Sequence, residues 1–192
     1  MFDLNKYKKE VKLKDGTKII LRPMAAEDQD ALYTFFKSVP KEDSRYLRDD
    51  VASILVVEEW AKNLDYTRTL PILALKNGTI IADATLNRRR FGWKWHLGTV
   101  RLFVHRDYRK VGLGQLMIKE IADIAFKLEL EKLIAVVPDV NISAINAFTK
   151  AGFYRAATIP NLVKDRENRP LDVVVMIKDI RPARDETYEY DF

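Results

Sequence analysis

The chain has 192 residues, of which 47% are hydrophobic and 32% charged, with only seven glycines and seven prolines, so a disordered or collagen-like chain is excluded. It contains no cysteine and only two histidines, His96 and His105, which excludes disulfides and thiolate zinc sites, and we therefore expect no metal. The formal net charge is +5, and because the last eight residues carry four acidic side chains and no basic ones, the positive charge is concentrated in the rest of the chain.

The first third of the chain predicts two strands followed by two helices. Residues 11–13 and 17–22 flank a KDG turn and predict a hairpin that ends at Pro23. Residues 26–39 combine acids in the first turn with an apolar face at helical spacing. Residues 51–64 carry a second apolar stripe of the same period, which predicts a second helix.

The middle of the chain changes to the period of a strand. Residues 70–90 predict a hairpin with Asn77 and Gly78 at its tip, which is the strongest short-range turn signal in the sequence. A further strand is expected at residues 95–104. A long amphipathic helix is then expected from Gly114.

The last third predicts one more strand and helix before a final pair of strands. Residues 132–137 are a short apolar run of buried-strand type, and residues 143–150 form a short helix that Gly152 ends. Residues 153–163 and 171–178 predict the closing strand pair. The order ββααβββαβαββ predicts a mixed α/β (α+β) protein with helices packed on a largely antiparallel sheet.

The stretch YRKVGLGQLM places two glycines, Gly112 and Gly114, at the start of the long helix, directly after Arg109 and Lys110. A helix start presents unpaired backbone N–H groups, and glycine lets a bulky anion approach them, so phosphate or pyrophosphate is the expected ligand. A P-loop would need GxxxxGK[ST], and a dinucleotide fingerprint would need glycine or alanine where Met117 stands. By itself, the motif leaves an anion site and a helix that merely begins with glycine both open.

Two signatures together resemble those of the GNAT superfamily of acetyl-CoA-dependent N-acetyltransferases. VHRDYRKVGLG resembles the signature R/Q-x-x-G-x-G/A, which follows the family's fourth strand and opens its central helix. NISAINAFTKAGF, at residues 141–153, resembles N-x-x-A-x-x-x-Y/F-x-x-x-G-F, which follows the fifth strand. The opening KDGTKIILRPMAAEDQDALYTFF is similar to the first strand and helix. The resemblance implies the GNAT fold: a mixed, largely antiparallel sheet splayed between strands 4 and 5, with helices on both faces.

The resemblance also implies acetyl-CoA as cosubstrate, lying in the splay. Backbone groups of Leu102, Phe103 and Val104 would pair with the pantetheine arm, and a bulge at Gly98 would open the strands. The other coenzyme-binding residues that the resemblance implies are Arg109, Lys110, Val111, Gly112, Leu113, Gly114 and Gln115 around the pyrophosphate, and Asn141, Ala144, Phe148 and Lys150 at the short helix.

The reaction implied by the resemblance is direct attack of a primary amine, from a small molecule or a protein lysine or N-terminus, on the thioester in a ternary complex. The backbone N–H of Val104 is the expected oxyanion donor. The family's usual tyrosine acid is replaced by Phe148, and its usual glutamate base by Thr99. Tyr154 and His96 are the remaining candidates for the acid and the base.

Alternatives from other classes stay open. Phe148 and Thr99 favour a non-catalytic acyl-CoA-binding module, which would bind the coenzyme without turnover. The positive charge and the basic, aromatic residues 88–95 favour a nucleic-acid-binding protein, although we expect this segment to be a solvated strand end. Residues 45–50, RYLRDD, lie where the family places its acceptor-side helices, so we expect them to help select the substrate.

The sequence also predicts the setting in which the protein works. MFDLNKYKKEV lacks the apolar core of a signal peptide, and no stretch approaches ~18 uninterrupted apolar residues, so we expect a cytoplasmic protein with no membrane partner. Residues 1–192 are expected to form one domain, with a core at about residues 10–180 and an acidic, aromatic tail at 181–192. The acceptor amine is not encoded in any motif, and a homodimer is left open.

Overall fold

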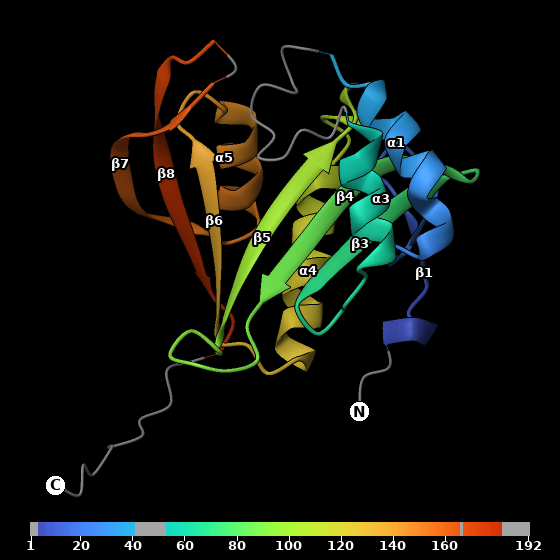
Figure 1. Cartoon of the computed structure of the whole chain (residues 1–192), viewed down its shortest axis with the longest axis horizontal. Coiled ribbons are helices and arrows are strands. Elements are labelled where there is room, and N and C mark those ends of the chain that lie inside the picture. Colours follow the sequence, from blue (N-terminus) through green and yellow to red (C-terminus); the bar gives the residue numbers. More distant parts are fainter. Residues whose placement is uncertain (1–3, 41–52, 166, 182–192) are drawn as a thin grey trace, which may run out of the picture.

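The computed structural model describes residues 4–40, 53–165 and 167–181. Their strands form one eight-stranded sheet in the order β1-β2-β3-β4-β5-β6-β8-β7. All neighbouring strands pair antiparallel except β5 and β6, which are parallel. Helices cover both faces of the sheet (Figure 1). The predicted mixed, largely antiparallel architecture is therefore confirmed.

The helices and strands follow one another in the predicted order, with short 3-10 turns added between them. In chain order the described elements are η1 (Leu4–Lys6), β1 (Lys9–Lys12), β2 (Lys18–Pro23), η2 (Ala26–Asp28), α1 (Gln29–Lys37), α3 (Ile54–Lys62), β3 (Thr69–Lys76), β4 (Thr79–Arg88), β5 (Leu97–Val104), η3 (Arg106–Tyr108), α4 (Leu113–Lys127), β6 (Lys132–Pro138), α5 (Ile142–Lys150), β7 (Tyr154–Lys164) and β8 (Pro170–Asp179).

Some element boundaries differ from those predicted. The strand expected at residues 95–104 begins at Leu97, because Trp95 donates its N–H to the Gly92 carbonyl (2.9 Å) and the preceding residues form turns. Residues 45–50 and nearly all of the acidic tail lie outside the described residues, so the expectations for them stay predictions. Within the described ranges, the helices are all too short or too polar to cross a membrane.

Side chains of the central strands pack into two hydrophobic cores, one on each face of the sheet. On one face, Ile72 of β3 lies in a cluster with Met117 and Ile121 of α4. On the other face, its neighbour Leu73 lies in a cluster with Phe36 of α1 and residues of α3. Burial of each large apolar side chain contributes about 1.5–3 kcal/mol. Because both faces of β3 and β4 are covered, a polar side chain on either strand is unusual and calls for an explanation.

The sheet opens between β5 and β6, the fourth and fifth strands in the family's count. These strands pair only over Leu97↔Lys132, Gly98↔Leu133 and Thr99↔Ile134, and then diverge (Figure 1). The predicted splay is therefore present. It separates the sheet into a larger part carrying α1, α3 and α4 and a smaller part of β6, β8 and β7 with α5 beside it (Figure 1).

The pairing of β4 with β5 shows no bulge at Gly98, where one was expected. β5 pairs with β4 without a shift from Gly98 to Val104. A Cβ at Gly98 would lie 2.7–2.9 Å from the side chains of Leu86, Leu130 and Leu133. Gly98 therefore allows close packing of three leucine side chains at the base of the splay, and the prediction of a bulge there is wrong.

Candidate functional site

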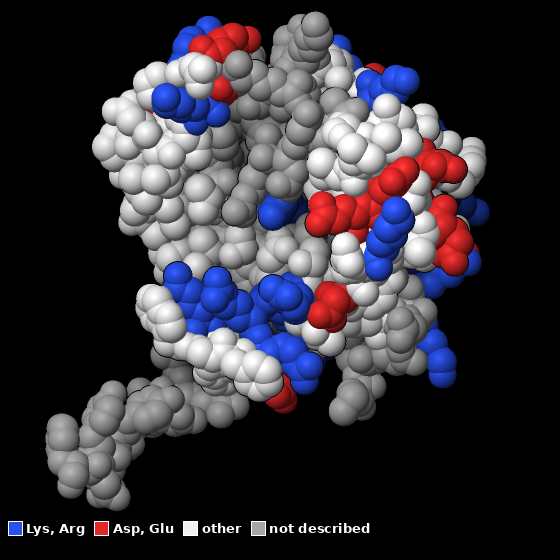
Figure 2. Space-filling model, viewed as in Figure 1, with Lys and Arg blue, Asp and Glu red and all other residues white. Residues whose placement is uncertain are grey.

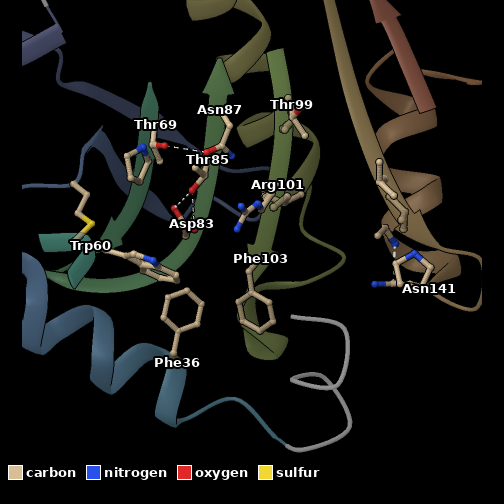
Figure 3. A pocket seen from close by; sticks show the side chains of 18 of the residues that line it. Phe36, Trp60, Thr69, Asp83, Thr85, Asn87, Thr99, Arg101, Phe103 and Asn141 are labelled. Carbon is tan, nitrogen blue, oxygen red and sulfur yellow. Dashed lines mark hydrogen bonds between the residues drawn. The ribbon is translucent and has the colours of Figure 1, made fainter. Parts of the chain in front are cut away.

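A cleft of about 930 Å3 lies where β5 and β6 diverge. One end is lined by Leu102 of β5, Val136 of β6 and Phe148 of α5, and the other end extends across β4 and β3 to α1 and α3. Figure 3 shows Phe36 and Trp60 at the end of the cleft formed by α1 and α3. Figure 2 shows acidic side chains gathered over these two helices. The cleft therefore has two parts: a narrow gap between strands and a wider polar and aromatic chamber.

The register of β5 determines which backbone groups face the gap. The His105 N–H donates to the Ile81 carbonyl (3.0 Å), and from this pair the direction of the backbone groups alternates along the strand. The N–H and C=O groups of Val104 and Leu102 therefore face the gap, whereas those of Phe103 face β4. This corrects the expectation that the Phe103 backbone binds the coenzyme; its ring lines the chamber instead.

The opposite edge of the gap is built in the same way. The Asp139 N–H donates to the Asp172 carbonyl (3.0 Å), so alternation along β6 directs the backbone groups of Val136 toward β5. Beyond Thr99 and Ile134 these two edges have no strand partner among the described residues. An extended molecule can therefore bind there as an additional strand, using backbone hydrogen bonds on either side.

The turn that leads into α4 has the geometry of an anion site. Gly112, the N-cap, has φ 86° and Lys110 has φ 64°, both in the left-handed region. In the part of the chain that the structure describes, the N–H groups of residues 110–115 donate no hydrogen bond. A Cβ at Gly114 would lie 3.4 Å from the Leu102 side chain, so glycine lets the helix start lie against β5. Successive free N–H groups at a helix start are typical of phosphate binding.

Side chains of the predicted motif brace this turn. Arg109 donates from Nε to the Val104 carbonyl (3.0 Å), and Gln115 donates from Nε2 to the Lys150 carbonyl (3.0 Å). The side chains of Lys110 and Lys150 are exposed. The predicted residues of the turn are therefore brought together, with Arg109 and Gln115 fixing its position relative to β5 and α5.

The other residues of the turn and of α5 contribute backbone groups, apolar surface and one amide. Leu113 is buried in the core, so only its backbone N–H is available to a ligand, and Val111 packs partly against the same core. Asn141, the N-cap of α5, accepts the Ala144 N–H at Oδ1 (3.2 Å), which leaves its Nδ2 for the cleft. Phe148 is buried against Phe153 with ring centroids 5.0 Å apart, and it lines the cleft together with Ala144.

The two residues predicted to transfer protons lie elsewhere. His96 lies just before β5, where its ring faces Trp95 at 5.8 Å and its carbonyl accepts the Glu131 N–H (2.9 Å). Tyr154 begins β7, is half exposed, and lies opposite Ile177 of β8. Neither residue lines the cleft. Their positions contradict a direct catalytic role, because a general acid or base must come within hydrogen-bonding distance of the reacting atoms.

Sequence reasoning singled out Thr99 but missed the other members of a row of polar side chains on β4 and β5. Asp83, Thr85 and Asn87 alternate along β4, and Thr99 and Arg101 lie beside them on β5, all lining the chamber (Figure 3). The available signal was the sequence of β4, in which polar residues at every second position alternate with apolar ones. Only the covered position of β4 in the sheet makes that alternation unusual.

The electrostatic environment of Asp83 is the most strongly perturbed in the chamber. Its two carboxylate oxygens lie 3.3 and 3.2 Å from Thr85 Oγ1, which donates to them. Desolvation by the surrounding walls raises the pKa of Asp83 to about 7, although the Thr85 hydrogen bond and the positive charge of Arg101 act in the opposite direction. A carboxyl group with such a pKa can exchange protons near neutral pH.

The basic, aromatic segment at residues 88–95 does not line the cleft. Phe91 and Trp93 are 80% and 84% exposed, and they are flanked by Arg90 and Lys94 at 5.6 and 4.7 Å from the respective rings. Figure 2 shows basic side chains gathered below the cleft, at the end of the molecule where β4 and β5 are joined (Figure 1). The exposure of this loop agrees with a solvated strand end.

A sheet splayed beside a glycine-rich helix start defines an acetyl-CoA-binding fold of the acetyltransferase type. The model of the acetyltransferase (GNAT) family matches residues 29–153, and the chain belongs to this family.

Solved structures with the same fold include several named acetyltransferases. The structure titled as yncA, a putative acetyltransferase from Salmonella typhimurium with its cofactor acetyl-CoA, is 18% identical, with a TM-score of 0.73 over 85% of this chain and 95% of that one. The ribosomal-protein-S5-alanine acetyltransferase from Vibrio fischeri is 14% identical, with a TM-score of 0.78 over 92% and 100%. The GNAT domain of S. lividans PAT is 20% identical, with a TM-score of 0.76 over 90% and 96%. At these identities the similarity establishes the fold and leaves the acceptor open.

Proposed function

We propose that the protein transfers an acetyl group from acetyl-CoA to a primary amine, on a small molecule or on a protein lysine or N-terminus, in a ternary complex. The observation that carries the proposal is the gap between β5 and β6, whose edges have no strand partner among the described residues beyond Thr99 and Ile134 and whose outer end meets the start of α4. Such a site fits an extended donor that ends in a pyrophosphate. Bound acetyl-CoA would supply an acetyl group activated as a thioester.

The residues that would hold acetyl-CoA fall into three groups. The N–H groups of residues 110–115 would bind the pyrophosphate, aided by the macrodipole of α4. Val104 and Leu102 on one edge, and Val136 on the other, would pair with the pantetheine arm. Asn141 would donate from the Nδ2 group that its capping role leaves unused.

The oxyanion that develops on the thioester carbonyl requires a donor fixed in position. The Val104 N–H remains the proposed donor because its direction is set by the register of β5, and the Leu102 N–H lies two residues further along the same edge. Phe148 has no proton to donate and is buried in apolar surroundings. A thiol with an ordinary pKa near 8.5 is a competent leaving group as the thiolate, so the reaction does not require a protein acid.

Two measurements test this proposal. Isothermal titration of the whole chain with acetyl-CoA tests binding, and thiol release in the presence of an amine panel tests transfer. We expect saturable binding and amine-dependent thiol release. Absence of heat and of thermal stabilisation at millimolar acetyl-CoA would refute the coenzyme assignment.

A second function, a non-catalytic acyl-CoA-binding module, is favoured by Phe148 and Thr99, which replace the family's usual acid and base. It predicts tight binding of acetyl-CoA with no thiol release above the buffer rate for any amine. Amine-dependent turnover would exclude it. A nucleic-acid-binding function predicts retention on a single-stranded oligonucleotide that falls steeply with salt and is unaffected by CoA.

A further inference from the structure

The polar face of the chamber contains groups whose hydrogen-bonding capacity is not met by the fold. Asn87 accepts the Thr69 hydroxyl at Oδ1 (3.0 Å), but its Nδ2 is buried and has no hydrogen-bond partner among the described residues. A buried amide donor normally has a partner, so an unmatched one that faces a cleft indicates a ligand or an ordered water.

Asp83 lies on the same face and is available to a ligand. Within the described ranges it forms no ion pair, and the Thr85 hydroxyl is its hydrogen-bond donor. Asp83 and Asn87 each lie two positions from Thr85 along β4, so the three side chains project from one face of the strand into the chamber (Figure 3). A carboxylate at this position can accept a proton from a group that enters between β4 and the opposite wall.

Charged side chains from several elements line the chamber together with Asp83. Arg101 projects from β5, Glu59 from α3, Asp65 from the segment after α3, and Lys164 from β7. Among the described residues, the lining thus holds three carboxylates and two cationic groups. This excess of negative charge attracts an ammonium ion. A carboxylate on the ligand would be attracted only weakly.

An apolar and aromatic surface adjoins the polar row. The Phe36 ring lies 6.0 Å from the Trp60 ring and 6.1 Å from the Phe103 ring, and Met24 and Leu32 complete this part of the lining. Figure 3 shows the three rings grouped on the side of the chamber that faces Asp83 and Arg101. The chamber therefore suits a molecule with a polar nitrogen at one side and an apolar body at the other.

We propose that this chamber is the acceptor site, that it takes a small primary amine carried on an apolar or aromatic body, and that Asp83 is the base that removes the ammonium proton. This inference rests on the proposed acetyl transfer and deepens it. Asn87 Nδ2 is a second fixed point for a hydroxyl or carbonyl oxygen on the acceptor.

The carboxylate of Asp83 takes one proton from the bound ammonium and leaves a neutral nitrogen with its lone pair. The carbon–nitrogen bond forms as the carbon–sulfur bond breaks, and the sulfur leaves with its electron pair. The second nitrogen proton passes to the sulfur or to solvent, and Asp83 later releases its proton to solvent, which its pKa near 7 allows at neutral pH.

Three probe amines test the acceptor class at saturating acetyl-CoA. 2-Phenylethylamine has the proposed amine and apolar body, L-phenylalanine adds a carboxylate to the same body, and ethanolamine lacks the apolar body. We expect kcat/KM to be at least about 10-fold higher for 2-phenylethylamine than for either of the others, as differences of this size are typical of a few lost apolar contacts or one repelled charge. A higher kcat/KM for L-phenylalanine or ethanolamine would overturn the proposed class.

The variant Asp83→Asn tests the base, with Asp123→Asn, an exposed carboxylate on α4, as matched control. General-base catalysis typically contributes about 100-fold or more, so we expect Asp83→Asn to lose at least that in kcat/KM and the control to be unchanged.

The pH profile of kcat/KM separates a catalytic role of Asp83 from a structural one. Wild-type kcat/KM should rise to a plateau above pH 7, because Asp83 is then ionised and the amine arrives as ammonium. Asp83→Asn should instead rise about tenfold per pH unit toward the amine's own pKa near 10, because only free amine reacts.

Asp83→Glu supplies a second test that does not depend on loss of function, since it should retain the plateau while lowering its height. Titration with acetyl-CoA separates this inference from the proposed function. If acetyl-CoA does not bind the wild type, the proposed function fails. If it binds, and either no probe amine reacts or Asp83→Asn keeps the wild-type rate and plateau, the acceptor-site inference is wrong and the coenzyme assignment stands.

Discussion

Asp83→Asn should stabilise the fold while it removes the proposed base. The pKa of Asp83 in the folded protein is about 7, against 3.8 for an ordinary aspartate, because desolvation disfavours the ionised form. As pH rises through this interval, Asp83 ionises in the unfolded chain but stays protonated in the folded protein. Ionisation therefore stabilises the unfolded state relative to the folded state. The folded protein therefore loses stability between about pH 4 and pH 7, and the loss is complete above pH 7.

The magnitude follows from the difference of about three pKa units. At 1.36 kcal/mol per unit, the full effect is about 4 kcal/mol, of which about 2.5 kcal/mol falls between pH 5 and pH 8. These are upper values, because Asp83 borders the cleft and is partly accessible to solvent. Asparagine cannot ionise, and its Oδ1 can still accept the Thr85 hydroxyl, so the variant lacks this pH-dependent penalty.

Urea unfolding of the wild type and Asp83→Asn at pH 5, 6, 7 and 8, without coenzyme, measures the effect. The difference in free energy of unfolding should grow in favour of Asp83→Asn as pH rises. For a chain of this length, ~2.5 kcal/mol corresponds to a difference of about 5–10 °C in Tm. The control Asp123→Asn should show no such trend. A stability difference between wild type and Asp83→Asn that stays constant within about 0.5 kcal/mol from pH 5 to pH 8 would mean that Asp83 titrates as an ordinary carboxyl.

Three further predictions concern the glycines and the cap of α5. Gly112→Glu and Gly114→Glu should each abolish acetyl-CoA binding in calorimetry with the circular dichroism spectrum retained, because the new carboxylate repels pyrophosphate at the N–H-rich turn; unchanged affinity in either variant would contradict the assignment. Gly98→Ala should cost about 1–3 kcal/mol in urea unfolding, because its Cβ would lie within 2.7–2.9 Å of three leucine side chains, and a cost near zero would show that these side chains move aside freely. Asn141→Asp should keep the cap of α5 and the stability but weaken acetyl-CoA binding, because it lacks Nδ2. Asn141→Ala should weaken binding and also lose about 1 kcal/mol of stability. Equal coenzyme affinity in the wild type and both variants would show that Nδ2 does not contact the ligand.

The coenzyme side of the site could be predicted because its signals are local in sequence. Gly112 adopts a left-handed φ at the helix start, and Gly114 allows the helix to lie close to β5, so both requirements act within a few residues. Asn141 caps α5 three residues before the N–H that it binds. A contiguous motif can encode such geometry without knowledge of the rest of the fold.

The acceptor side could not be predicted in the same way. Asp83 and Trp60 are separated in sequence and are brought to one chamber only by the packing of α3 against the sheet. His96 and Tyr154 have suitable chemistry, but the turn before β5 and the pairing of β7 with β8 place them away from the cleft. The pKa of Asp83 is likewise a property of the walls around it, because an aspartate in water would ionise near 3.8.

The sequence by itself determined the order of helices and strands, the mixed sheet and the glycine-rich turn, since hydrophobic period and turn chemistry are properties of neighbouring residues. Only the tertiary structure decided which way each backbone group and side chain faces. Phe103 shows this most clearly: its backbone pairs with β4 although those of Val104 and Leu102 face the gap. The physical reason is that successive residues of a strand alternate in direction, so the register between strands, which is set by distant parts of the chain, decides what each residue can bind.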